Sequence, residues 1–435
     1  MRSERIWGIW ALTSEIMRLG DFCTFVAGSS FPNRFQGKST GDYPFIKVSD
    51  MKLEMNQYRI LVANNWIDQN EADELRARPI PAGSIVFAKI GLGLFNNRMR
   101  LTTMPTLMDN NMMAAIPKKG VSSDVLYSIM NTLDMQTWAI GAALPYVRGT
   151  DLEKIKLEHI SFDNLSRTSE IESKINLMKD EVSQNSQILR EIASVLFRSW
   201  FIDFDPVNAK AEDKLPYGMD KETAALFPNT FENSELGPIP TGWKWGQLGD
   251  CISVVGGGTP STKNEDFWGG KYNWTSPKDL SNSNSIIMLD TERTITEAGL
   301  AKVSSGLLPV DTVLMSSRAP IGYLALSKIP VAINQGYIAI PPKNSMSPNF
   351  MLSWIHFNMP LIEAYSSGST FPEISKKEFR KLPILIPPAE LIEKFNEKTT
   401  RLYDSMETSL KQMNSLISTK DAILPRLMSG ELKEI

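Results

Sequence analysis

Residues 167–201 of this chain read RTSEIESKINLMKDEVSQNSQILREIASVLFRSWF, a stretch without proline or glycine. Its apolar side chains recur at alternating spacings of four and three residues, a pattern that predicts a helix with a coiled-coil seam. The seam positions are Ile171, Ile175, Met178, Val182, Asn185, Leu189, Ile192 and Leu196, of which only Asn185 is polar. Because so narrow an apolar stripe is stable only when another helix buries it, the stretch requires a helical partner.

A matching helix is predicted near the end of the chain, where the same spacing returns. Its seam positions are Tyr403, Met406, Leu410, Met413, Ile417 and Leu424, with Lys420 as a polar interruption. Each position from Ile175 to Leu196 has its counterpart there at an offset of about 228 residues, so the two helices belong to a repeat. We expect them to pair with each other. The alternative is two ordinary core helices of one compact domain.

The sequence ahead of each helix is also repeated, and its echoes keep the same order and nearly the same offset. They pair Leu19-Gly20-Asp21 with Leu248-Gly249-Asp250, residues 80–86 with 308–314, Asn110 and residues 115–117 with Asn334 and residues 339–341, and residues 145–152 with 372–379. A period this long indicates two whole domains rather than a solenoid. If a pseudo-two-fold axis relates the repeats, the helices are antiparallel and one globular module lies at each end.

The chain therefore divides into five expected segments. They are a first module at residues 1–160, a helix at 161–205, a linker rich in proline and glycine at 206–242, a second module at 243–387 and a helix at 388–435. Short apolar runs between turn residues predict strands at residues 84–89, 112–116, 312–315 and 337–340. Short helices are expected at residues 123–132 and 348–356. The expected fold class is α+β.

Composition sets limits on the class of protein. Hydrophobic residues make up 42% of the 435 residues and charged residues 22%, which is ordinary for a globular protein. No apolar run approaches the roughly 20 residues that span a bilayer. Residues 1–14 are typical of an amphipathic helix rather than of a signal peptide, so we expect a cytoplasmic protein. A net charge of −3 argues against extensive phosphate binding, although a DNA reader with small contact patches and a basic partner can be acidic.

The sequence contains no recognisable catalytic or metal site. Its two cysteines, Cys23 and Cys251, follow equivalent echoes, so we expect them to be far apart, and the two histidines, His159 and His356, complete no set of metal ligands. Gly91-Leu92-Gly93 lacks the third glycine and the helix of a dinucleotide fingerprint, and residues 256–260 lack the Lys-Ser/Thr pair of a phosphate-binding loop. We therefore expect no catalytic residue, no metal and no cofactor in this chain.

Several motifs resemble those of one known family. They are residues 234–243 (SELGPIPTGW) leading into Leu248-Gly249-Asp250, residues 256–261 (GGGTPS), residues 366–372 (SSGSTFP), residues 382–388 (LPILIPP) and residues 424–432 (LPRLMSGEL). Together with the duplication and the two helices, these motifs resemble the specificity subunits of type I restriction-modification systems, which defend cells against phage. The resemblance covers nearly the whole chain.

This resemblance implies a non-catalytic subunit with two target-recognition domains, each reading one half of a bipartite sequence in double-stranded DNA. The helix pair would act as a ruler and as the docking site for two methyltransferase subunits, and restriction subunits would join that core. The methyltransferase subunits would bind S-adenosylmethionine and methylate adenine N6, and the restriction subunits would use ATP and Mg. The first module departs from the family pattern, with residues 29–32 in place of the glycine-rich loop and residues 141–144 in place of the Gly-Ser-Thr segment.

Readout of base edges needs Arg, Lys, Asn or Gln on loops, and phosphates can also be contacted by hydroxyl groups. The candidates for DNA contact are Arg34, Lys38, Lys47, Lys89, Arg98, Arg100 and Arg148 in the first module, and Lys263, Lys278, Arg318, Asn334, Gln335, Ser369 and Thr370 in the second. Asn334 and Gln335 adjoin an apolar strand, so a structural role is the alternative for both.

A helix of about 34 residues rises roughly 50 Å, which corresponds to one to one and a half turns of duplex. The expected target is two short half-sites with an unread spacer. Two other functions remain open from the sequence. One is a DNA-binding or architectural protein without methyltransferase partners, and the other is a scaffold whose helices bind proteins and whose modules bind peptide or glycan.

Overall fold

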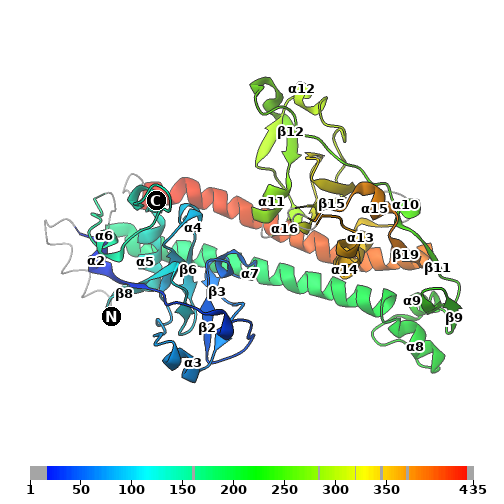
Figure 1. Ribbon diagram of the computed structural model, residues 1–435, viewed down its shortest axis with the longest axis horizontal. Coiled ribbons are helices and arrows are strands. Elements are labelled where there is room, and N and C mark those ends of the chain that lie inside the picture. Colours follow the sequence, from blue (N-terminus) through cyan, green and yellow to red (C-terminus); the bar gives the residue numbers. More distant parts are fainter. Residues whose placement is uncertain are drawn as a thin grey trace. The chain divides into compact units, whose positions relative to one another are not determined.

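The computed structural model describes residues 17–158, 162–282, 285–318, 320–342, 346–368 and 372–428 (Figure 1). The helix expected at residues 1–14 lies outside them. The chain forms two compact units, one of Met1–Gln184 with Gln412–Ile435 and the other of Asn185–Lys411. Unit 1 holds the first module, unit 2 holds the second, and each unit contains part of both long helices. No helix in the described ranges is long and apolar enough to cross a membrane.

Module 1 is built on two small sheets. In its described part, five strands are ordered β1-β8-β5-β6-β3, antiparallel except for the parallel pair β3 and β6, and three more are ordered β4-β2-β7. The strands are β1 (Cys23–Ala27), β2 (Tyr43–Ile46), β3 (Arg59–Ile60), β4 (Trp66–Ile67), β5 (Ile85–Ala88), β6 (Met99–Thr102), β7 (Leu107–Met108) and β8 (Met112–Pro117). The strands expected at residues 84–89 and 112–116 are thus confirmed as β5 and β8.

Short helices pack against the two sheets of module 1. They are α2 (Leu19–Phe22), α3 (Gln69–Glu74), α4 (Leu92–Phe95), α5 (Ser123–Asn131) and α6 (Gly149–Leu152). The expected helix at residues 123–132 is α5, whose Ser122 side chain accepts a hydrogen bond from the Val125 N–H and caps the helix. The expectation that no helix follows Gly91 is wrong, because α4 is a single helical turn that begins there.

Module 2 repeats the central strand pairing of module 1. Its described strands form sheets ordered β13-β16-β15-β18 and β14-β12-β17, and the ribbon β11-β19. They are β11 (Lys244–Gln247), β12 (Trp268–Thr275), β13 (Ile287–Met288), β14 (Arg293–Ile295), β15 (Thr312–Ser317), β16 (Ile321–Ser327), β17 (Val331–Ile333), β18 (Tyr337–Ile340) and β19 (Pro383–Ile386). Leu314 faces Ala339 across β15 and β18, as Val86 faces Ala114 across β5 and β8. The duplication predicted from the sequence is therefore visible in the strand register.

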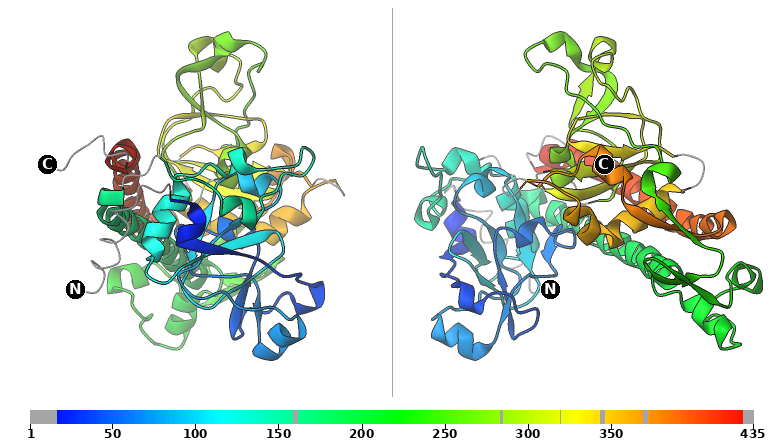
Figure 2. Two further views of the ribbon diagram at one scale, coloured as in Figure 1. Left: turned by 90° about the vertical axis from the view of Figure 1, so that its left-hand side faces the viewer. Right: turned by 45° about the vertical axis from the view of Figure 1, so that its right-hand side comes forward.

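Helices pack around these sheets in unit 2. They are α10 (Leu248–Cys251), α11 (Pro277–Asn282), α12 (Glu297–Leu300), α13 (Pro348–Phe357), α14 (Met359–Ala364) and α15 (Lys376–Arg380). The helix expected at residues 348–356 is α13, and its Phe350, Met351 and Ile355 are buried in the core. The three-stranded sheet with β12 and α12 projects from the rest of module 2 (Figure 2).

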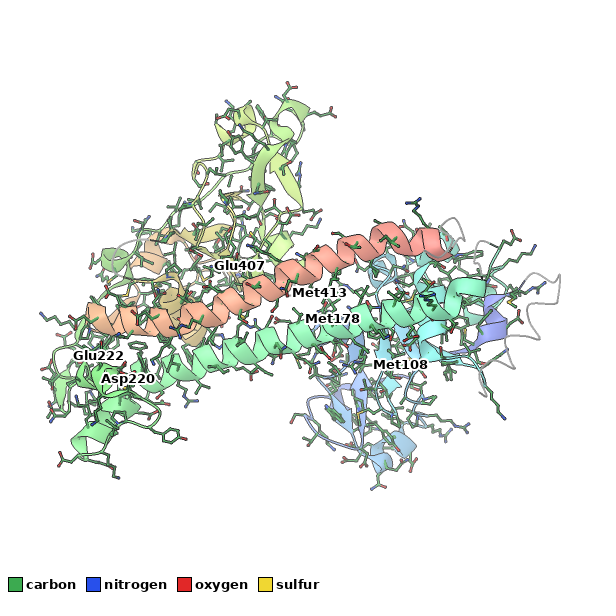
Figure 3. All side chains as sticks on the ribbon, turned by 180° about the vertical axis from the view of Figure 1, so that it is seen from behind. Met108, Met178, Asp220, Glu222, Glu407 and Met413 are labelled. Carbon is green, nitrogen blue, oxygen red and sulfur yellow. The ribbon has the colours of Figure 1, made fainter. Side chains whose placement is uncertain are left out.

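The segment expected to be a linker, residues 206–242, is instead folded. It contains α8 (Asp205–Ala211), α9 (Lys221–Ala225), β9 (Phe231–Ser234) and β10 (Gly237–Pro240). Val207 and Phe227 are buried in the core of unit 2. Asp220 and Glu222, which Figure 3 labels, form ion pairs with Lys398 and Lys394 on the last long helix. Apolar side chains between its prolines and glycines fix this segment against the helices, and the expectation of a linker is corrected.

The two long helices are α7 (Phe162–Phe201) and α16 (Ala389–Met428). They are antiparallel in unit 2, because the Phe197 ring lies 5.7 Å from that of Phe395 while Arg190, earlier in α7, lies near Tyr403, later in α16. The antiparallel pairing that the pseudo-two-fold repeat predicts is thus observed within this unit.

The predicted seam is buried on α16 but only partly on α7. Tyr403, Met406 and Met413 are buried, and Leu410 and Ile417 are half-buried. On α7, Ile175, Val182, Leu189 and Leu196 are half-buried, whereas Ile171, Met178, Asn185 and Ile192 are exposed. The side chain of Leu424 lies outside the described residues. In unit 1 the fully buried face of α7 is polar and carries Thr168, Glu172, Asn176, Asp180 and Ser183. This face is turned toward module 1, which therefore excludes water from α7 more completely than the second helix does.

Candidate nucleic-acid interface

Three candidate cations of module 1 lie together around a 3₁₀ turn at Asn33–Phe35. Arg34 pairs with Glu74 at 2.6 Å, and Lys38 pairs with Glu71 at 2.7 Å and Asp68 at 3.1 Å. Lys47 donates to the Gln36 side chain and lies over the Phe31 ring, 5.3 Å from its centre. The hydrogen bonds that Lys38 donates to Glu71 and Asp68 raise its pKa, so it stays cationic. Exposed ion pairs of this kind contribute about 0–1 kcal/mol each, so phosphates can replace the acidic partners.

Lys89 and Arg148 form a second group on adjacent backbone segments. The Val147 N–H donates to the Lys89 carbonyl at 3.0 Å, which brings Arg148 beside Lys89. Arg148 pairs with Asp151 at 2.7 Å and remains largely exposed, and Lys89 forms no ion pair with another residue that the structure describes. Arg98 is half-buried and lies outside this group.

Arg100 is a structural residue, and its assignment as a DNA contact is corrected. Its side chain is 8% exposed, and its guanidinium donates to the carbonyls of Asn56, Met99 and Met51. Burial lowers its pKa. Burial and these three hydrogen bonds hold the guanidinium inside the module, away from any base edge. The sequence offers no signal that separates it from Arg98.

Replacing Arg100 with alanine is expected to destabilise module 1 strongly. Three buried carbonyls would lose their donor, which we expect to lower the free energy of unfolding by about 3 kcal/mol. Thermal unfolding of the chain should then shift downward by roughly 6–12 °C. Arg98→Ala, which removes a neighbouring half-buried arginine, is the control and should shift it far less. Equal shifts for the two variants would contradict the structural role of Arg100.

In module 2, Asn334 and Gln335 hold the glycine-rich loop. Asn334 donates to the Thr259 hydroxyl at 2.6 Å, and that hydroxyl donates to Gln335 at 2.6 Å. Gly257 has no room for a side chain, because a Cβ atom there would lie 1.8 Å from the Ile333 carbonyl oxygen. The structural alternative for Asn334 is therefore supported, while the exposed Gln335 remains a candidate.

The other described candidates of module 2 are exposed on separate segments. Lys263 follows the glycine-rich loop, Lys278 pairs with Glu292 at 3.3 Å, and Arg318 lies 3.6 Å from Glu373. Ser369 and Thr370 lie outside the described residues. DNA contact by the candidates other than Arg100 stays a prediction.

One cationic feature of module 2 is absent from the sequence candidates. Arg293 on β14 lies over the Trp268 ring, 3.3 Å from its centre, and 5.8 Å from that of Trp274. The two indole rings meet edge to face at 5.1 Å. The aromatic residues Trp268, Tyr272 and Trp274, which fall at even spacing in β12, are the sequence signal that could have indicated this stack, since cations prefer aromatic faces.

Neither a metal-binding cluster nor an activated thiol is found among the described residues. Among the described residues, no group of three His, Cys, Asp or Glu side chains is placed to hold a metal ion. Both cysteines are free thiols, and burial raises the pKa of Cys23 to about 12, which keeps it protonated and weakly nucleophilic. His159 lies outside the described residues.

Two α+β modules with the same central strand pairing, each packed on the long helices, define a protein with an internal duplication. Residues 12–159 and 240–413 match the model of the type I restriction modification DNA specificity domain. Since these matches span most of the chain, the chain belongs to that family and contains two regions of the domain.

Two relatives carry names from the same systems. The specificity subunit of type I restriction enzyme MjaIX from Methanocaldococcus jannaschii is 36% identical over 186 residues, which cover 42% of this chain and 43% of that protein. The specificity subunit of type I restriction enzyme HindI from Haemophilus influenzae is 26% identical over 330 residues, 63% of this chain and 71% of the relative. The chain thus matches less than half the length of the first relative.

The fold is also found in a solved structure. The crystal structure of a type I restriction-modification S subunit from M. genitalium superposes with a TM-score of 0.53 and 13% identity, over 96% of this chain and 97% of that one. This chain therefore shares its fold with that subunit.

Proposed function

We propose that this chain is the DNA-reading subunit of a type I restriction-modification complex, in which each module reads one half of a bipartite duplex sequence. The observation that carries the proposal is the presence of two DNA specificity domains in one chain. Two such domains in one chain suit a DNA target that consists of two separated half-sites.

The charge distribution supports limited contact of each module with DNA. Cations are gathered in small groups on module 1, at Arg34, Lys38 and Lys47 and at Lys89 and Arg148, while the chain as a whole has a net charge of −3. Phosphate neutralisation by a few cations gives weak, salt-sensitive affinity. The remaining contacts would come from partner subunits.

An apolar stripe on α7 supports docking of those partners. Ile188, Ile192 and Val195 are 52%, 49% and 67% exposed, and their spacing of four and three residues places them on one helix face. Large exposed apolar patches mark protein interfaces. We assign this stripe to a methyltransferase subunit, which would hold S-adenosylmethionine. Restriction subunits, with ATP and Mg, would join the assembly, and this chain would carry out no chemical step.

Charge placed on the stripe is expected to weaken assembly. Val195→Glu would bury a carboxylate against the partner, so we expect at least a tenfold loss of affinity for the methyltransferase subunit. Co-purification and titration of the two proteins measure this loss. Leu215→Glu, which places a carboxylate at an exposed apolar residue outside α7, is the matched control. Wild-type affinity for V195E would show that the partner docks elsewhere.

Selection of DNA from a random duplex library tests the proposed function itself. The chain, co-expressed with its methyltransferase subunits, should enrich duplexes with two fixed half-sites and a spacer of constant length and variable sequence. Enrichment of a single contiguous motif, or of no motif, would contradict bipartite reading. Sequence-independent binding by the chain alone would favour an architectural DNA-binding protein.

A further inference from the structure

A buried carboxylate joins module 1 to α7. Asp180 is fully buried, and its Oδ1 accepts a hydrogen bond from the Tyr58 N–H at 2.7 Å. Its Oδ2 accepts from the Arg59 N–H at 3.3 Å and from the Arg59 Nε at 2.8 Å. A buried carboxylate is strongly unfavourable unless its partners compensate, and here two backbone donors and one guanidinium do so. These hydrogen bonds fix the direction in which β3 of module 1 lies on α7.

Other polar contacts between α7 and module 1 surround this carboxylate. Glu172 accepts from the Ser128 hydroxyl and from the Asn131 side chain, both on α5. Ser173 donates to Asp124 at 2.8 Å, and Ser183 donates to the Glu54 carbonyl. Hydrogen bonds are directional, so these contacts specify an orientation that apolar packing alone does not.

Apolar contacts of α7 with module 1 lie along the same stretch of the helix. Leu165 is fully buried in the core of module 1, and Leu177 packs partly against it. Asp180 follows Leu165 by fifteen positions, or roughly 22 Å along a helix. Module 1 thus contacts α7 along residues 165–183, and Asp180 fixes module 1 near the end of this stretch that lies farther from Leu165.

Module 2 is held by a similar arrangement of charge, in which a lysine of the module faces carboxylates of α16. Lys328, at the end of β16, is 2.9 Å from Asp311 and reaches Glu407 at 3.3 Å and Asp404 at 3.8 Å on α16. Buried Tyr403 and Met406 pack at the same place on α16. The repeat puts the exposed Thr408 of α16 where α7 has Asp180, so α16 has no buried carboxylate at that position.

We propose that Asp180 is a positioning residue that sets the direction in which module 1 presents its DNA-reading surface, and thereby the spacer length that the complex accepts. The inference rests on the proposed function. According to this inference, discrimination between spacer lengths depends on how module 1 is attached to α7 as well as on the helices themselves. Asp180 itself reads no base.

Asp180→Asn tests this assignment, because it keeps the size of the side chain but sets an NH₂ group against the donors of Tyr58 and Arg59. The full complex is assayed for methylation of duplexes with fixed half-sites and spacers one base pair shorter, equal and one longer. We expect D180N to lower discrimination between spacers at least tenfold and to leave base preference within each half-site unchanged. Glu170→Gln, which removes an exposed carboxylate of α7 that pairs with Lys174 on the same helix, is the control and should change discrimination less than threefold.

Arg59→Gln serves as the second variant if D180N does not assemble, since it removes the ion pair and leaves both backbone donors in place. It should relax spacer discrimination to a smaller extent. The inference is overturned if the assembled variant accepts only the wild-type spacer, or if its methylation falls equally at every spacer. A wild-type complex without a split motif would instead overturn the proposed function.

Discussion

Inserting one heptad into α7 and one into α16 is expected to lengthen the spacer of the recognition sequence by about three base pairs. Seven helical residues add about 10 Å, and each base-pair step of duplex is about 3.4 Å. The insertion points are the boundaries between the two units, after Gln184 and after Lys411, which leave the contacts inside each unit intact. The spacer is read by selection from the random duplex library.

Insertion of a heptad into α7 alone should abolish methylation or alter the spacer, since the seams of the two helices would no longer match in length. The control is an insertion of seven residues after Gly218, in the exposed turn between α8 and α9, which should leave the motif unchanged. An unchanged spacer in the double insertion would contradict the role of the helices as a ruler.

Removal of the cation group of module 1 is expected to weaken DNA binding at every sequence. Replacing Arg34, Lys38 and Lys47 with glutamine removes up to three phosphate contacts. The slope of log K against the logarithm of the salt concentration should therefore become shallower by about three. The affinity of the full complex for its target, titrated between low and physiological salt, gives this slope.

A matched set of substitutions tests whether position matters as well as charge. Arg198→Gln with Lys214→Gln removes exposed cations that lie outside the modules, on α7 and on the turn after α8. This pair should leave the slope almost unchanged. If the module 1 triple variant and this pair gave the same slope, the group around the 3₁₀ turn would not be a DNA surface.

Periodicity predicted the long helices well but not every face that they bury. The four-three spacing identified both helices and their pairing, and Tyr403, Met406 and Met413 are buried as it requires. It missed the buried polar face of α7, because Glu172 and Asp180 have the composition of a solvated face and owe their burial to module 1. Partners distant in sequence, such as Tyr58 and Arg59, decide that burial.

The candidate site was predicted less completely than the fold. Residue type and loop position selected Arg34, Lys38 and Lys47, which lie together, but also Arg100, which is buried. Type alone cannot distinguish an arginine that satisfies carbonyls from one that faces solvent. The prolines and glycines of residues 206–242 likewise favour a linker, whereas Val207 and Phe227 of that segment are buried in the core.

Base-modification sequencing of the host genome, with the gene present and deleted, tests the central claim most directly. Our account predicts N6-methyladenine in one bipartite motif when the gene is present, and loss of methylation at that motif alone when it is deleted. Restoration by the wild-type gene should return the same motif. A methylome that is unchanged by deletion, in a host whose methyltransferase subunits are expressed, would contradict the role of this chain as the subunit that selects the methylated sequence.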